Sequence, residues 1–83
     1  MQVGLLLIDG FALMSYASVI EPFRAANNLS GQELYRWKHL SVAGAQVSAS
    51  NGLTSLVDYP VSDAPALDRV FVFAAGDPAA YAD

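Results

Sequence analysis

The sequence contains no cysteine and only one histidine among its 83 residues. The absence of cysteine excludes disulfides, a thiolate nucleophile and any zinc site with sulfur ligands. A single histidine also excludes a metal site built from several histidines of one chain. Neither G-x-G-x-x-G nor a phosphate-loop motif is present, so nucleotide binding has no support. We therefore expect no cofactor and no metal.

Charge is equally scarce. Four Lys and Arg residues and eight Asp and Glu residues make up 14% of the chain and give a formal net charge of −4, against a typical charged share of about 25%. An acidic domain lacks the electrostatic footprint of a nucleic-acid binder and the polybasic character of a protein that docks on anionic lipid. We expect these residues to contact neither DNA nor membranes. Because 54% of the residues are hydrophobic, we expect partners or a larger unit to cover the chain.

Long hydrophobic runs are missing too. The run from Val3 to Ile8 is interrupted by Asp9, far short of the roughly 20 residues that a membrane span needs. No Lys or Arg precedes it, so it does not resemble a signal peptide. The sequence thus predicts a cytoplasmic protein.

Apolar patterning over the first 30 residues predicts a strand followed by a helix. Residues 2–8 are apolar on both alternating faces, as in a parallel strand covered on both sides. Residues 11–29 have the length of a helix, and its apolar face is expected to carry Leu13, Tyr16, Ile20, Phe23 and Asn27. Pro22 predicts either a bend near Ser18 or two short helices. Asp9 and Asp77 are favoured as helix N-caps.

The remaining residues predict further strands. Residues 35–42 and 69–74 are expected to be strands, the second buried on both faces. Asn51-Gly52 predicts a two-residue hairpin between strands 47–50 and 53–57. Residues 58–67 are expected to connect the hairpin to the strand at 69–74, with about one helical turn. Residues 75–78 are expected to open a further helix. The fold class is therefore α/β with a mainly parallel sheet and a short β-hairpin, and we expect the first part of a larger, truncated domain.

Candidate binding residues follow from position. In an open α/β sheet, ligands bind outside the carboxyl ends of the strands, which here are occupied by Asp9, Gly10, Phe11, Ala75 and Gly76. Four aromatic residues either line a pocket for a cationic ligand or form ordinary core, namely Phe11, Tyr16, Tyr35 and Trp37. Ser48 and Ser50 lack a nucleophile elbow, and His39 is expected to pack on its strand rather than act as a base.

Several short motifs point to a known family. They are Asp9-Gly10-Phe11, Glu21-Pro22-Phe23-Arg24-Ala25-Ala26-Asn27 and Ser48-Ala49-Ser50-Asn51-Gly52. Together they resemble the N-terminal sensor domain of AraC-type bacterial transcription regulators, which is similar to the ThiJ/PfpI and class I glutamine amidotransferase-like fold. The resemblance implies a flavodoxin-like sandwich of which residues 1–83 form the N-terminal part. It implies an amino-acid-like or quaternary-ammonium metabolite as ligand, and DNA binding only through a C-terminal domain absent from this chain.

The alternative is a fragment of a ThiJ/PfpI-type cysteine hydrolase or amidotransferase. In those relatives a cysteine after the next strand is the nucleophile, an acid from the first helix assists it, and a Gly-Gly pair supplies backbone donors. The acid falls near Ser15 and the glycine pair at Ala75-Gly76, so this sequence departs from the pattern at both places. We therefore expect a non-enzymatic sensor, and we expect the chain on its own to self-associate.

Overall fold

The computed structural model describes residues 1–74, and the helix start expected after residue 75 lies outside them. The elements are β1 (Gln2–Leu7), α1 (Leu13–Ser30), β2 (Arg36–Ser41), β3 (Gln46–Ser48), β4 (Thr54–Leu56), β5 (Tyr59–Pro60), a 3₁₀ turn (Val61–Asp63) and β6 (Arg69–Phe73). This composition confirms the α/β prediction, including the helical turn in the connector. The short strand β5 was not predicted.

Four parallel strands form the main sheet in the order β5-β2-β1-β6, and β3 and β4 form a separate antiparallel pair. β1 is central, with Val3 opposite Trp37 of β2 on one side and Arg69 of β6 on the other. Its Val3 and Leu5 side chains are fully buried. Gly4 faces the other way, where a Cβ would lie 2.6 Å from Leu67 Cδ1. The prediction of a strand covered on both faces is confirmed for β1.

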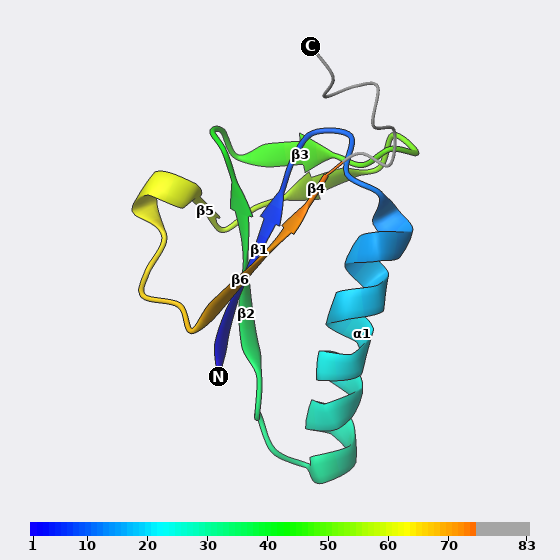
Figure 1. The fold of residues 1–83 in the computed structure, drawn as a ribbon, viewed down its shortest axis with the longest axis vertical. Coiled ribbons are helices and arrows are strands. Elements are labelled where there is room, and N and C mark those ends of the chain that lie inside the picture. Colours follow the sequence, from blue (N-terminus) through cyan, green and yellow to red (C-terminus); the bar gives the residue numbers. More distant parts are fainter. Residues whose placement is uncertain (75–83) are drawn as a thin grey trace.

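The helix α1 lies along one face of the sheet (Figure 1). Its predicted apolar face is confirmed, because those side chains are buried or half-buried and most of them join the core of Val3, Leu5, Leu7 and Phe73. α1 continues through Pro22 as one helix, so the two-helix alternative is wrong. It ends at Gly31, whose left-handed conformation (φ 69°) lets its N–H bond the Asn27 carbonyl. Within residues 1–74 no helix is long and apolar enough to cross a membrane.

Asp9 does not cap α1, contrary to prediction. The helix begins at Leu13, two residues later than expected, and its N-cap is Ala12, which makes no side-chain capping bond. The Asp9 carboxylate instead accepts the Ser48 N–H at 3.1 Å. A tight turn intervenes, in which Gly10 has φ 84° and the Phe11 N–H donates to Ile8 O. This turn separates Asp9 from the first helical turn. Asp77, the other predicted cap, lies outside the described residues.

The hairpin is confirmed, but its loop has three residues rather than two. The Ala49 N–H donates to Leu53 O and the Gly52 N–H donates to Ala49 O, which leaves residues 50–52 as the loop. A two-residue Asn-Gly turn needs positive φ at both residues. Only Gly52 has it (φ 89°), while the Asn51 side chain accepts the Leu53 N–H. The geometry resembles the common three-residue loop with glycine in the left-handed region.

β6 is not buried on both faces as predicted. Val70 and Val72 are 48% and 61% exposed, while Phe73 on the opposite face is 5% exposed. β6 is the outer strand of the described sheet, and α1 covers only the face that carries Phe73. The apolar sequence of this strand therefore does not reflect the burial of both faces within residues 1–74.

Candidate functional site

The first three predicted site residues lie together at the carboxyl end of β1, against the hairpin. The Gly10 N–H donates to Ser48 O at 2.7 Å, and the Ser50 N–H donates to Phe11 O at 2.8 Å. The Ala12 N–H donates to Ala74 O at 3.0 Å, so the end of β6 lies beside them. The carboxyl ends of β1 and β6 therefore meet, whereas Ala75 and Gly76 lie outside the described residues.

Phe11 points into the core rather than into a cavity. Its side chain is 2% exposed, and its ring lies edge-on to Tyr16 with centroids 6.0 Å apart. Tyr16 also meets Phe73 edge-on at 5.7 Å. Edge-to-face pairs at this spacing stabilise a core beyond the area that they bury. Phe11 therefore positions the loop after β1 by packing.

A small cavity of about 160 Å³ opens at the carboxyl ends of β1 and β2. Its lining is Leu7, Ile8, Asp9, Ser41, Val42, Ala43, Gln46 and Val47. Asp9 is the one charged residue of that lining, and Ser41 is fully buried with its hydroxyl donating to Gly44 O at 2.7 Å. Sequence reasoning missed residues 41–47. They could have been found by applying the carboxyl-end rule to the second strand as well as to the first and last.

A chain of polar side chains joins α1, β2 and the connector. Tyr16 Oη lies 2.8 Å from His39 Nε2, and His39 Nδ1 lies 3.8 Å from the Asp58 carboxylate. The same carboxylate also accepts the main-chain N–H of His39 at 2.7 Å, and the main-chain N–H of Asp58 donates to the His39 carbonyl. His39 is half-buried on its strand, as predicted. Within residues 1–74 no three His, Asp or Glu side chains gather closely enough to hold a metal ion.

Burial shifts the pKa values of two of these side chains. Desolvation lowers the pKa of His39 below its usual 6.5, although the Asp58 carboxylate acts in the opposite direction. Desolvation, together with the Glu21 charge, raises the pKa of Tyr16. In a neutral imidazole with its proton on Nδ1, Nε2 accepts the Tyr16 hydroxyl and Nδ1 lies 3.8 Å from the Asp58 carboxylate. Burial therefore favours the neutral form of His39.

The histidine makes stability depend on pH in a predictable direction. Because the folded-state pKa is lowered, the unfolded chain binds more protons below pH 6.5, so stability falls as the pH drops from 6.5 toward the folded-state pKa. His39 is the only histidine, so His39→Gln should abolish the change in the free energy of unfolding between pH 7 and 5.5. Urea denaturation at a series of pH values measures it. A wild-type stability that rises on acidification would mean that Asp58 outweighs burial.

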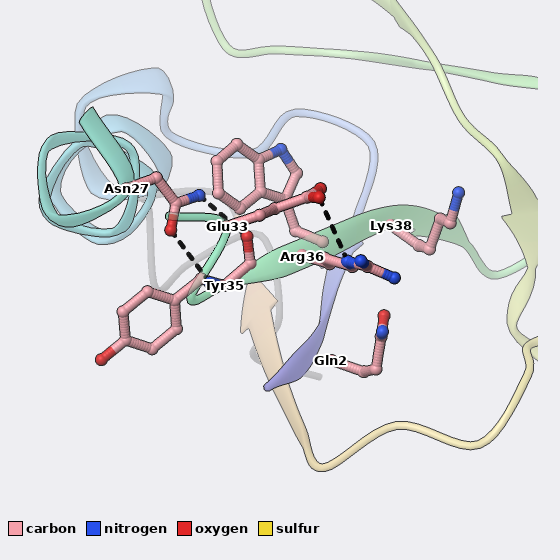
Figure 2. A pocket seen from close by; sticks show the side chains of 7 residues that line it. Gln2, Asn27, Glu33, Tyr35, Arg36 and Lys38 are labelled. Carbon is pink, nitrogen blue, oxygen red and sulfur yellow. Dashed lines mark hydrogen bonds and ion pairs between the residues drawn. The ribbon is translucent and has the colours of Figure 1, made fainter. Parts of the chain in front are cut away.

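A larger cavity of about 450 Å³ lies at the opposite end of the sheet, where β2 begins (Figure 2). Tyr35 and Trp37 are among its lining residues, and Tyr35 stacks on Phe23 of α1 with ring centroids 4.6 Å apart. Tyr16 instead packs edge-on against Phe11 and Phe73. The four aromatic residues therefore form two separate groups and do not enclose one cation-binding pocket.

Comparison with known proteins finds relatives among bacterial regulators, although no protein-family model matches the chain. The HTH-type transcriptional regulator GbdR of Pseudomonas aeruginosa is 54% identical over 71 residues, which are 86% of this chain and 19% of GbdR. GlxA of Rhizobium meliloti, also an HTH-type transcriptional regulator, is 44% identical over 82 residues, 99% of this chain and 25% of GlxA. The HTH-type transcriptional regulator CdhR of P. aeruginosa is 40% identical over 73 residues, 88% of this chain and 21% of CdhR. The chain thus spans about a fifth to a quarter of these relatives.

Solved structures identify the fold. An AraC family transcriptional regulator from Pseudomonas putida superposes with a TM-score of 0.77 at 22% identity, over 89% of this chain and 46% of that one. Toxoplasma gondii DJ-1 superposes with a TM-score of 0.70 at 17% identity, over 90% of this chain and 39% of that one. The chain therefore has the flavodoxin-type α/β fold that these structures share, with a mainly parallel sheet, as the sequence predicted.

Proposed function

We propose, on the premise that its homologues are HTH-type transcriptional regulators, that this chain is the N-terminal part of the effector-binding domain of such a regulator. The effector is a small metabolite that carries a positive charge, either amino-acid-like or a quaternary ammonium compound. DNA is bound through a separate domain, since a net charge of −4 opposes contact with phosphates.

The cavity beside Asp9 is the observation that carries this proposal. It lies at the carboxyl ends of β1 and β2, where α/β sheets bind ligands. Its volume of about 160 Å³ suits a small molecule, and its lining is apolar and neutral-polar apart from the Asp9 carboxylate. One carboxylate in such a setting favours a ligand with one cationic group, which it attracts electrostatically. Asp9 is exposed and therefore accessible.

We further propose that the domain does not catalyse a reaction. The sequence has no cysteine to act as a nucleophile. Ser15, which stands near the position of the assisting acid of the enzyme relatives, is exposed on α1 and carries no carboxylate. His39 is engaged by Tyr16 and packs beneath the helix. These features support a sensor built on an enzyme-like fold.

Ligand binding should depend on the Asp9 charge. We expect a free amino acid or its N-trimethylated counterpart to raise the unfolding free energy by about 2.7 kcal/mol at a hundred times its Kd. Asp9→Asn keeps an oxygen that accepts the Ser48 N–H but removes the charge, so it should weaken binding about tenfold, or ~1.4 kcal/mol. Calorimetric titration and thermal unfolding measure both effects.

Asp63→Asn is the matched control, because Asp63 is exposed on the 3₁₀ turn and does not line the cavity. It should bind like the wild type. Equal binding by Asp9→Asn and the wild type would refute the assignment of this cavity.

The exposed Val70 and Val72 side chains of β6 support the expectation that the chain alone self-associates.

A further inference from the structure

The hydrogen bonds of β2 show which of its main-chain groups face away from β1. The Arg36 N–H donates to Met1 O, on the side of β1, at 2.9 Å. The His39 N–H and C=O both bond Asp58, on the opposite side. Because main-chain groups alternate in direction along a strand, the N–H and C=O groups of Tyr35, Trp37 and His39 all face outward, away from β1.

Two of these three outward-facing residues already have hydrogen-bond partners for both main-chain groups. Asn27 Oδ1 accepts the Tyr35 N–H at 2.9 Å, and Asn27 Nδ2 donates to Tyr35 O at 2.8 Å. Asp58 bonds both main-chain groups of His39. β5 pairs only with Leu40 and Ser41 of β2. The Trp37 main-chain groups face away from β1 and lie before the start of the β5 pairing, and within residues 1–74 no hydrogen bond from outside the strand ladders reaches them. One N–H and one C=O therefore remain open between two occupied neighbours.

The 450 Å³ cavity lies along this open position and carries positive charge. Arg36 and Lys38 line it, and they are two of the four Lys and Arg residues of the sequence. Glu33 lies 3.4 Å from Arg36, but both side chains are more than half exposed, so this pair is weak and easily displaced. Figure 2 shows Glu33 reaching over β2 toward Arg36.

We propose that this edge, defined by Arg36, Trp37 and Lys38, is a docking site for an extended acidic polypeptide segment with the pattern acid-x-acid. The central residue x pairs antiparallel with Trp37 and exchanges both N–H···O bonds with it. Antiparallel pairing fits because a single residue then uses both open groups, whereas parallel pairing needs two residues.

Side-chain alternation explains the acidic pattern. Residue x lies on the sheet face of the Trp37 side chain, and its two neighbours lie on the face of Arg36 and Lys38. Carboxylates at those two positions meet the two cations. The Asn27 and Asp58 bonds on either side limit the site to about three residues, typical of a short added strand. This site is at the opposite end of the sheet from the Asp9 cavity and does not depend on the proposed metabolite.

Trp37 makes the test direct, because it is the only tryptophan in the sequence. The probe is acetyl-Val-Glu-Val-Glu-Val-amide, titrated while tryptophan fluorescence is recorded. We expect a saturable spectral change. The matched peptide with lysine in place of glutamate, and the acidic peptide N-methylated at its central valine, should each bind at least tenfold more weakly.

The protein variants test the cations. The double substitution Arg36→Gln and Lys38→Gln should weaken the acidic peptide about tenfold, an effect of ~1.4 kcal/mol. Arg24→Gln, an exposed cation on α1 outside the cavity, should leave binding unchanged. Three results would overturn the proposal: no saturable change with the acidic peptide, equal affinity for the acidic and basic peptides, or binding that N-methylation does not weaken.

Discussion

Replacing Phe11 with alanine is expected to lower the free energy of unfolding by about 3–5 kcal/mol, the largest effect of any substitution considered for this chain. The side chain is 2% exposed and packs in the core against Tyr16. Its removal leaves a cavity between α1 and the sheet that the surrounding strands fill only partly. Urea denaturation followed by circular dichroism measures the change. If the wild type is less stable than this loss, the variant should be unfolded even without urea.

Met14→Ala is the control, since Met14 lies three residues away and is 82% exposed. It should change stability by no more than about 0.5 kcal/mol. A Phe11→Ala variant as stable as Met14→Ala would show that Phe11 is not part of the core. It would instead favour the sequence-based expectation that this residue contacts a ligand.

The second large effect is expected at Asn27, whose amide bonds both main-chain groups of Tyr35. Asn27→Ala leaves a half-buried N–H and C=O without those partners, which costs about 1–3 kcal/mol. Asn27→Asp should lie between the wild type and the alanine variant, because a carboxylate accepts the Tyr35 N–H but cannot donate to its carbonyl. Equilibrium unfolding in urea ranks the three proteins.

Asn28→Ala supplies the comparison, because the neighbouring asparagine is exposed and should tolerate the change within about 0.5 kcal/mol. If Asn27→Ala and Asn28→Ala were equally stable, water would satisfy Tyr35 as well as the amide does. The two hydrogen bonds from Asn27 to Tyr35 would then contribute nothing to stability.

Periodicity alone predicted most of the elements, because burial on both faces or on one face leaves a clear pattern in β1, α1 and β2. It failed at β6, where the apolar sequence resembles that of β1 although Val70 and Val72 are exposed in residues 1–74. Apolar patterning reports which surfaces are suited to burial and not what covers them. The Asn51-Gly52 signal placed the hairpin correctly, but the Ser50 bond to Phe11 belongs to tertiary structure and is invisible to local turn rules.

The candidate site was predicted in part. The carboxyl-end rule located Asp9, but propensity also favoured this residue as a helix cap. The structure instead pairs its carboxylate with the Ser48 N–H of β3, 39 residues away in the sequence. The polar chain from Tyr16 to Asp58 was not predicted at all. Its members come from three elements, and no spacing along the sequence signals that their side chains meet.

The central position of β1 has a consequence for the timing of folding during synthesis. β1 emerges from the ribosome before the strands that flank it, yet Val3 pairs with Arg69, 66 residues later. At about 5–20 residues per second, roughly 3–13 s pass between the synthesis of the two partners. The unit of β1, α1 and β2 is complete well before then, so one edge of the most buried strand waits unpaired while the hairpin and the connector are made. Nascent chains stalled before residue 69 should therefore be more prone to aggregation than chains stalled after β6 has emerged.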